Sequence, residues 1–304
     1  MKNFKLVSGS SYPLFANKLA DKLGLPLTNV DIGSFPDNET RVRVLDDVQG
    51  DSVFILQSIA IDPDRYLMQL MILGDALKRS SAKELTAVLP YYAYGRQDRR
   101  NKKREPITAK LVADLLERAG FDRVITMDLH TDQVEGFFNK PVENLDPLST
   151  FFSYLKNDDV DGDWVVVAAD IGSIKRARNL ADMLGAEVAT VFKHRIDSFS
   201  VKAVALMGDV KAKRVILVDD MCTTAETLAK ASILCRSKGA LEVRALVTHG
   251  LFVEGAKDKI ENSTIDKMYI SDTIPGVEKI NINNLQVISV VGDFVRSIEK
   301  CLHA

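Results

Sequence analysis

The chain has 304 residues, of which 46% are hydrophobic and 27% are charged, so it is long enough for two domains with cores of ordinary size. Its formal net charge of -2 argues against nucleic-acid binding and against attachment to an anionic membrane surface. No apolar run approaches the about 18 residues of a membrane span, the N-terminus lacks a signal-peptide core, and the three cysteines lack metal-ligand spacing, which together predict a reduced cytoplasmic location.

The first half alternates segments that are typical of strands and helices. We predict strands at residues 5–8, 40–44, 53–57, 85–90 and 123–127, and a strand or loop at 31–35. Helices are predicted at residues 13–23, 66–78 and 106–119, with glycines ending the first and the third. The segment 136–148 contains two prolines and is the candidate domain boundary.

The second half repeats this pattern. Strands are predicted at residues 164–169, 188–192, 215–218, 243–247 and 267–270, and helices at about 175–185, 228–238 and 292–302. Strands that alternate with helices predict an α/β fold with mainly parallel sheets, which bind ligands at their carboxyl edges. Both halves therefore look like one α/β domain used twice.

The strongest local signal follows the predicted strand at 215–218. That strand runs directly into the carboxylates of Asp219 and Asp220. The hydroxyl-rich turn that opens the next helix carries Thr223, Thr224 and Thr227. Carboxylates accept hydrogen bonds from ribose hydroxyls, and a helix N-terminus binds phosphate, so the stretch suits a sugar phosphate. The alternative is a strand followed by an ordinary N-capped helix.

Three further features also suggest a phosphorylated ligand. Phe35 lies among acids before the strand at 40–44, where its ring could stack on a purine or pack into its own domain. Residues 96–104 contain six cations. They form a solvated loop, an RNA-binding segment or a triphosphate site. Aromatic residues precede the cations rather than alternate with them, which favours the triphosphate site over RNA binding. His130 follows Asp128 at a strand end and is either structural or a metal or phosphate contact.

Eight short motifs occur along nearly the whole chain. They are Phe35-x-Asp37-x-Glu39, Tyr91-x-x-Tyr94-x-Arg96-Gln97-Asp98-Arg99, Pro106-Ile107-Thr108-Ala109-Lys110, Met127-Asp128-Leu129-His130, Gly136-Phe137-Phe138, Lys193-x-Arg195, Val218-Asp219-Asp220 and Asn262-Ser263. In these motifs and their order the chain resembles the ribose-phosphate diphosphokinase family, also called phosphoribosyl-diphosphate synthetases.

The resemblance implies an α/β fold of two similar phosphoribosyltransferase-type domains, each a mainly parallel sheet flanked by helices. It implies an N-terminal nucleotide-binding domain at residues 1–144 and a C-terminal ribose-5-phosphate-binding domain at 145–289. The last helix, at about 290–304, is then able to pack back on the first domain.

The family transfers the diphosphoryl group of ATP to the 1-hydroxyl of ribose 5-phosphate, giving phosphoribosyl diphosphate and AMP for nucleotide biosynthesis, with Mg2+ as cofactor. The resemblance implies ATP-binding roles for Phe35, Asp37, Glu39, Arg96, Gln97 and Asp98. It implies ribose-5-phosphate-binding roles for Asp219, Asp220, Thr223, Thr224, Ala225 and Thr227. His130 and Asp170 match positions at the metal or the phosphates it bridges, and Lys193 and Arg195 match a catalytic pair that neutralises charge on the leaving AMP.

The same resemblance implies partners. The substrates are ATP and ribose 5-phosphate, and neither nucleic acid nor membrane is a partner. In the family a neighbouring subunit supplies the loop that contains the position of Phe35, so a homodimer that builds to a hexamer is expected.

The chain departs from the family pattern at several positions. Thr223 replaces an Asp, and Glu226 replaces a Gly of the sugar-phosphate loop. Glu226 either points to solvent or repels the phosphate, at a cost of about 4 kcal/mol for like charges about 4 Å apart at an effective dielectric of about 20. Ser173 replaces the second residue of a Gly-Gly pair, and His194 replaces an Arg. The chain ends at Ala304 without the family's Ser-rich tail, which predicts weak or absent inhibition by ADP.

Other function classes compete with the active diphosphokinase. A catalytically impaired paralogue that serves as a regulatory or structural subunit is the main alternative, and Glu226 and the altered 193–197 segment motivate it. A phosphoribosyltransferase would leave the first half without a role. A nucleic-acid binder would rest on residues 96–104 alone and conflicts with the net negative charge.

Overall fold

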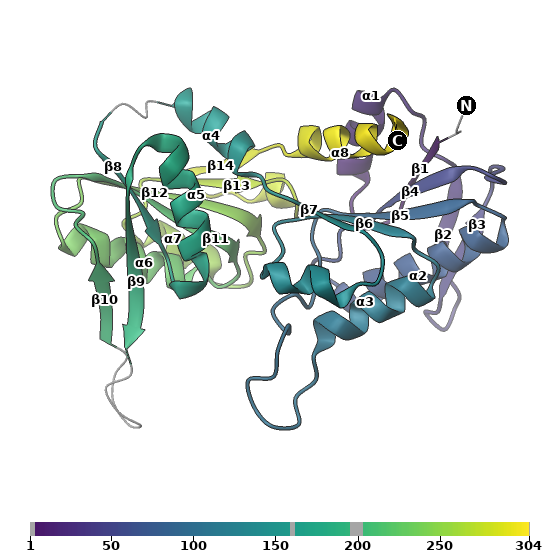
Figure 1. Cartoon of the computed structure of the whole chain (residues 1–304), viewed down its shortest axis with the longest axis horizontal. Helices are drawn as coiled ribbons and strands as arrows, with labels where there is room; N and C mark the ends of the chain where they lie inside the picture. Colours follow the sequence, from purple (N-terminus) through teal and green to yellow (C-terminus); the bar gives the residue numbers. More distant parts are fainter. Residues whose placement is uncertain (1–3, 159–161, 195–202, 304) are drawn as a thin grey trace. The chain divides into compact units, whose positions relative to one another are not determined.

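The structure is a computed structural model that describes residues 4–158, 162–194 and 203–303 (Figure 1). The chain divides into two compact units. Unit 1 comprises Met1–Asp146, Thr273–Pro275 and Val290–Ala304, and unit 2 comprises Pro147–Asp272 and Gly276–Ser289. Each unit has its own sheet and its own hydrophobic core.

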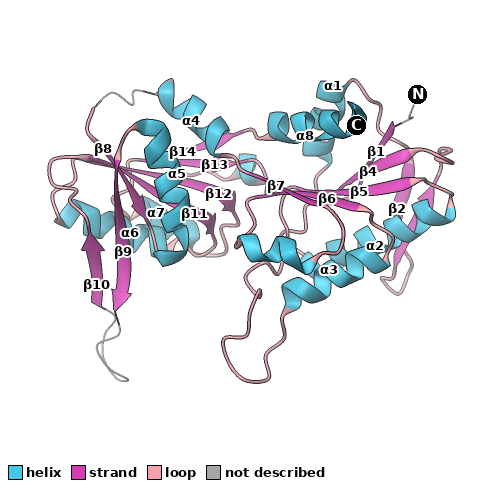
Figure 2. Ribbon diagram, in the orientation of Figure 1, coloured by secondary structure: helices cyan, strands magenta, loops and turns pink. Residues whose placement is uncertain are grey.

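Unit 1 is built on a five-stranded sheet in the order β1-β4-β5-β6-β7, in which every neighbouring pair is parallel (Figure 2). Its strands are β1 (Phe4–Ser8), β4 (Ser52–Leu56), β5 (Glu84–Leu89), β6 (Arg123–Met127) and β7 (Val142–Leu145). All five residues of β4 are buried. A parallel sheet that is covered on both faces requires such continuous apolar strands.

Helices cover both faces of this sheet. On one face lie α1 (Pro13–Leu23) and α8 (Val291–His303), and on the other lie α2 (Pro63–Arg79) and α3 (Thr108–Arg118) (Figure 1). Phe15 of α1 and Phe294 of α8 meet edge to face, with ring centroids 5.5 Å apart. The last helix of the chain thus completes the core of unit 1.

An antiparallel hairpin stands outside the five-stranded sheet of unit 1. It consists of β2 (Val30–Ser34) and β3 (Thr40–Val44). Its side chains are only partly buried, and β3 packs beside α2. The short 3-10 helix η1 (Asp132–Phe137) precedes β7.

Unit 2 contains a seven-stranded sheet in the order β10-β9-β8-β11-β12-β13-β14. Its strands are β8 (Trp164–Ala168), β9 (Glu187–His194), β10 (Ala203–Met207), β11 (Arg214–Cys222), β12 (Glu242–Gly250), β13 (Lys267–Ser271) and β14 (Leu285–Ile288). All pairs are parallel except β9 with β10.

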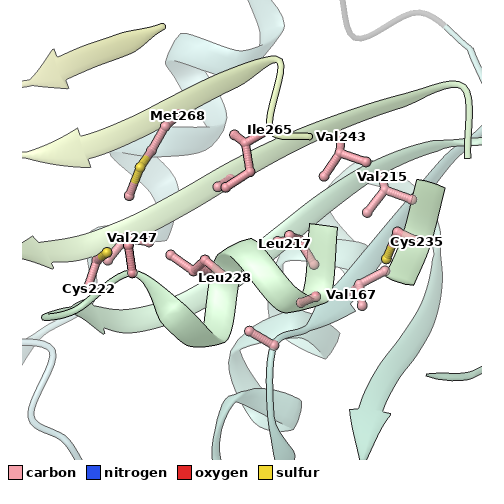
Figure 3. Packing of buried hydrophobic residues seen from close by; sticks show 14 of the residues in the cluster. Val167, Val215, Leu217, Cys222, Leu228, Cys235, Val243, Val247, Ile265 and Met268 are labelled. Atoms are coloured by element: carbon pink, nitrogen blue, oxygen red, sulfur yellow. The ribbon is translucent and has the colours of Figure 1, made fainter. Parts of the chain in front are cut away.

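Alternate residues of β11 reach the two cores of unit 2. Val215 and Leu217 join the core beneath α6 (Glu226–Ser237) and α7 (Ala256–Glu261), and Figure 3 shows this packing. Ile216 and Val218 join the opposite core, with α4 (Leu148–Lys156) and α5 (Ile174–Leu184). The 3-10 helices η2 (Ile171–Ser173) and η3 (Val277–Lys279) complete the unit. Because β11 is buried on both faces, its carboxyl end is held rigidly.

The structure confirms the α/β class and most of the predicted elements. The sequence patterns do not predict the helices α4 and α7 or the strands β7, β10 and β14, and each of these strands lies at an edge of its sheet. β11 also continues beyond the predicted end at residue 218, because its pairing with β12 extends to Cys222 and Gly250. None of the helices in the described part of the chain combines the length and the apolar character that a membrane span needs.

Candidate active site

Acidic side chains gather at the carboxyl ends of β8 and β11, which are neighbouring parallel strands of unit 2. Asp219 and Asp220 lie in the last part of β11 and are only 8% and 5% exposed. Asp170 follows β8 and caps η2, where its carboxylate accepts a hydrogen bond from the Ser173 N–H at 3.2 Å. Because parallel neighbours end at the same edge of a sheet, the fold brings these predicted carboxylates together.

Ionisation of Asp219 is disfavoured within this cluster. Burial, and then the nearby carboxylates of Asp220 and Asp170, raise the pKa of Asp219 well above its usual value. The Ser173 hydroxyl acts in the opposite direction, because it donates a hydrogen bond to Asp219 Oδ1 at 2.8 Å. Carboxylates crowded in this way are stabilised by a cation or by hydroxyl donors. The edge therefore suits a hydroxylated ligand together with a cation.

Backbone hydrogen bonds fix the loop that follows β11. The carbonyl oxygen of Cys222 accepts from the N–H groups of Leu251 at 2.9 Å and Phe252 at 3.1 Å. The carbonyl oxygen of Thr223 accepts from the N–H of Val253 at 2.9 Å. The segment after β12 thus holds the start of this loop in place.

The loop ends where α6 begins. Ala225 is the N-cap of α6 and adopts a left-handed φ of 60°. Thr223 and Thr224 precede it, and Thr227 lies in the first turn of the helix. The predicted sugar-phosphate residues therefore occupy one continuous strand end, loop and helix N-terminus. Such an end carries the positive pole of the helix dipole, which favours phosphate.

Glu226 directs its carboxylate toward two lysines. It forms a hydrogen-bonded ion pair with Lys230 one turn along α6, and Lys259 of α7 approaches its Oε2 to 4.0 Å. The Glu226 side chain is 54% exposed. The sequence leaves two possibilities, in which the Glu226 side chain either points to solvent or repels the phosphate. This arrangement favours the first, with the negative charge paired to lysines.

The corresponding edge of unit 1 joins the loops after β5 and β6. The Asp98 carboxylate accepts a hydrogen bond from the Thr131 hydroxyl at 2.9 Å. A Cβ placed on Gly95 would lie 3.6 Å from the Cβ of His130, so the two loops are in contact. The predicted residues Arg96, Gln97 and Asp98 and the predicted His130 therefore lie on adjacent loops of one sheet edge.

The first of these loops is also anchored to α3. The Gln97 side-chain oxygen accepts a hydrogen bond from the Thr108 hydroxyl, and the Gln97 carbonyl accepts from the Ala109 N–H at 3.2 Å. The Tyr92 hydroxyl donates to the carbonyl of Ala109 at 2.9 Å. Arg96 is exposed beside these anchored residues.

Phe35, Asp37 and Glu39 lie at the tip of the β2–β3 hairpin. The Phe35 N–H donates to the Glu39 carbonyl at 2.8 Å, which closes the tip. Phe35 is 48% exposed, so about half of its surface is open to solvent. The hairpin is a sheet separate from the one that carries Arg96, Gln97 and Asp98.

The predicted catalytic pair falls largely outside the described residues. Lys193 lies in β9, with its backbone opposite Val204 of β10, and its side chain is not described. Arg195 lies outside the described residues.

Two features of the site are not predicted from the sequence. The bond from Ser173 to Asp219 depends on the register between β8 and β11, and the only sequence signal is the departure from Gly-Gly. The contact of Val253 with Thr223 links segments 30 residues apart in sequence and leaves no local signal.

Both units are α/β folds whose polar residues collect at the carboxyl edges of parallel sheets, with carboxylates and a helix N-terminus in unit 2 and a cationic loop in unit 1. These features define an α/β protein that binds phosphorylated ligands.

Comparison with known proteins narrows this class. Residues 4–120 match the model of the N-terminal domain of ribose phosphate pyrophosphokinase, and residues 197–303 match the phosphoribosyl synthetase-associated domain. A ribose-phosphate pyrophosphokinase from Wolinella succinogenes is 43% identical over 303 residues, covering 100% of this chain and 97% of the relative. Another from Aquifex aeolicus is 40% identical, covering 99% and 97%. The chain belongs to the ribose-phosphate pyrophosphokinase family.

A solved structure gives the same result. The crystal structure of phosphoribosylpyrophosphate synthetase from Mycobacterium smegmatis matches with a TM-score of 0.95 at 37% identity, and the match covers 99% of both chains. This similarity confirms the predicted family and its two-domain α/β fold type.

Proposed function

We propose that the protein transfers the diphosphoryl group of ATP to the 1-hydroxyl of ribose 5-phosphate, producing phosphoribosyl diphosphate and AMP for nucleotide biosynthesis. The full-length similarity to ribose-phosphate pyrophosphokinases carries this proposal. In the reaction the 1-hydroxyl oxygen bonds to the β-phosphorus while the bond from that phosphorus to the bridging oxygen of AMP breaks. AMP keeps the electron pair, and the hydroxyl proton is released.

Unit 2 is the proposed ribose-5-phosphate domain. Asp219 and Asp220 accept hydrogen bonds from the ribose hydroxyls, which would offset the crowding of buried carboxylates at this edge. The 5-phosphate is held by the loop and by the first turn of α6, at Thr223, Thr224, Ala225 and Thr227. The fixed backbone of this loop supports a preorganised phosphate site.

Unit 1 is the proposed nucleotide domain. Arg96, Gln97 and Asp98 bind ATP from the anchored loop after β5. Phe35 stacks on the adenine, with Asp37 and Glu39 accepting from its amino group, and the exposure of the Phe35 ring supports this role. We propose that the hairpin acts on the site of a neighbouring copy, within a homodimer that builds to a hexamer.

Mg2+ is the proposed cofactor. Asp170 in unit 2 and His130 in unit 1 would each contact the metal or a phosphate group. The donor set in unit 2 fits, because Mg2+ prefers carboxylate oxygens and usually takes only one or two of them. Among the described residues, no three His, Cys, Asp or Glu side chains are arranged to hold a metal by themselves. When bound, the metal supplies positive charge to the phosphate oxygens.

Lys193 and Arg195 are the proposed catalytic cations. Negative charge develops on the bridging oxygen as AMP leaves, and two cations there stabilise the transition state more than the ground state. Removal of either charge should therefore lower kcat with little effect on stability.

All three cysteines are free thiols, which supports a cytoplasmic location.

The proposal is tested by incubating the protein with ATP, ribose 5-phosphate and MgCl2. Phosphorus NMR detects the formation of AMP and phosphoribosyl diphosphate. We expect Asp220→Asn to lower kcat/KM for ribose 5-phosphate by about tenfold or more, because it removes charge from the sugar site. Asp209→Asn, at an exposed position after β10, is the matched control and should leave turnover unchanged. Release of AMP that does not depend on the sugar phosphate would contradict the proposed reaction.

The main argument for the alternative, a catalytically impaired paralogue, is weakened. Its strongest argument is the charge of Glu226 beside a bound phosphate, and Lys230 and Lys259 lie against that charge. The proposed ligands Asp170, Asp219 and Asp220 are also all present at one sheet edge.

A further inference from the structure

A buried hydroxyl lies between two carboxylates of unit 2. Ser173 is 1% exposed, and its Oγ lies 2.8 Å from Asp219 Oδ1 and 3.3 Å from Asp170 Oδ1. A serine hydroxyl has a single proton, so it donates fully to only one of these carboxylates at a time. Asp219 is the nearer acceptor, and Asp170 is within reach as a competing one.

The surrounding backbone keeps Ser173 in this position. The Ser173 N–H donates to Asp170 Oδ1 at 3.2 Å, so the residue is tied to Asp170 through its main chain as well. A Cβ on Gly172 would lie 3.2 Å from the same Asp170 oxygen, which shows how closely the turn wraps the carboxylate. The two carboxylates are therefore the near acceptors of the Ser173 hydroxyl. A change at one carboxylate alters the hydrogen bond that Ser173 donates to the other.

The same bond orients Asp219. Its Oδ1 accepts from the Ser173 hydroxyl and also from the Asp220 N–H at 3.0 Å. Two donors on Oδ1 fix the plane of the carboxylate. Loss of the Ser173 donor would free this rotation inside a buried site.

We propose that Ser173 is a positioning residue that couples cation binding at Asp170 to sugar binding at Asp219. The proposal rests on the proposed function. A cation held by Asp170 would make its carboxylate a weaker hydrogen-bond acceptor, so the Ser173 proton would stay on Asp219. Asp219 is then held in the orientation that receives the ribose hydroxyls. Without the cation the proton is shared, and the sugar site is less well ordered.

A purely structural role for Ser173 makes a different prediction. If the hydroxyl only stabilises the fold, its removal weakens sugar binding by the same factor with and without the cation. If it couples the two sites, its removal changes the ratio of the two affinities. The logarithm of this ratio is proportional to the coupling free energy, and a uniform loss of binding does not change it.

The experiment measures ribose 5-phosphate binding to the full chain by calorimetry, without ATP, in MgCl2 and in EDTA. We expect Mg2+ to tighten binding to the natural protein by about tenfold, and we expect this ratio to fall to about threefold or less in Ser173→Ala. Ser173→Gly, which restores the family's residue, should show the same reduced ratio. Ser232→Ala is the control, since Ser232 is also fully buried but bonds to the Ala229 carbonyl of α6. It should keep the natural ratio.

The outcomes separate this inference from the proposed function. A natural protein that does not bind ribose 5-phosphate overturns both. A natural protein that binds the sugar equally in MgCl2 and EDTA, or folded Ser173→Ala and Ser173→Gly variants that keep the natural ratio, overturn the coupling alone. Thermal unfolding identifies which variants are folded, and Ser173→Gly serves if Ser173→Ala is not.

Discussion

The carboxylate of Glu226 in the first turn of α6 lies 4.0 Å from the ammonium group of Lys259 in α7. Lys230 pairs with the same carboxylate from within α6. An acid in the first turn is also favoured by the helix dipole. The negative charge that the family lacks at this position is therefore accompanied by two positive charges close to the proposed phosphate loop.

Removal of both lysines should expose the charge of Glu226 to the substrate. We expect the double variant Lys230→Gln and Lys259→Gln to raise the KM for ribose 5-phosphate by about threefold, because exposed ion pairs contribute about 0.2–1 kcal/mol. Adding Glu226→Gln should restore the KM. Steady-state kinetics at saturating ATP measures both effects. A rise in KM that Glu226→Gln does not reverse would mean that the lysines bind the phosphate directly.

The left-handed backbone of Ala225 gives a stability test of the loop. Ala225→Gly should change the free energy of unfolding by less than about 1 kcal/mol, because relief of left-handed strain offsets the lost methyl group. Ala229 is the control, since it is also buried but lies within α6. Ala229→Gly should cost about 2 kcal/mol. Urea unfolding followed by Trp164 fluorescence measures both, and equal losses would contradict the strained N-cap.

The bond from Thr131 to Asp98 tests the nucleotide site. Thr131→Val removes this hydrogen bond and should raise the KM for ATP by about fivefold, because Asp98 is no longer held beside its neighbours. The KM for ribose 5-phosphate should not change. Thr264→Val in unit 2 has no role in the proposed nucleotide site and serves as the control. Equal changes in the two KM values would contradict the assignment of Asp98 to ATP.

The sequence predicts the central strands well because most of their residues are apolar and buried. β4 and β8 are buried along their whole length, and a strand covered on both faces has that composition. The strands that escape prediction are β7, β10 and β14. Each is an edge strand of four or five residues, so it needs fewer apolar residues and shows a weaker pattern.

The candidate site divides in the same way. The positions of Asp219, Asp220 and Thr223 are predictable because these residues lie close together in sequence, directly after a strong strand signal. The bridge from Ser173 to Asp219 and the pairing of Glu226 with Lys259 are not, since each depends on how separate elements pack. A sequence reports the residues on a loop, but not which neighbour receives their hydrogen bonds.

Asp158, which follows the C-cap of α4, gives the chain a pH-dependent contribution to stability. It accepts hydrogen bonds from Lys267 and Tyr269, and Arg244 lies 3.8 Å away. Partial burial raises the pKa of Asp158, but these bonds and the charges of Lys267 and Arg244 outweigh it and hold the pKa below its ordinary value. A lowered folded-state pKa stabilises the protein above the unfolded value of about 3.9, and that stabilisation is lost as the pH falls through the folded value.

Asp158→Asn should therefore cost about 1 kcal/mol at neutral pH, where the natural carboxylate is ionised, and less as the solution becomes acidic. Urea unfolding at a series of pH values measures the difference in unfolding free energy between the natural protein and the variant. Asp182→Asn, at an exposed position on α5, is the control and should show little difference at any pH. A difference for Asp158→Asn that stays constant down to about pH 3 would show that its hydrogen bonds do not depend on the ionised carboxylate.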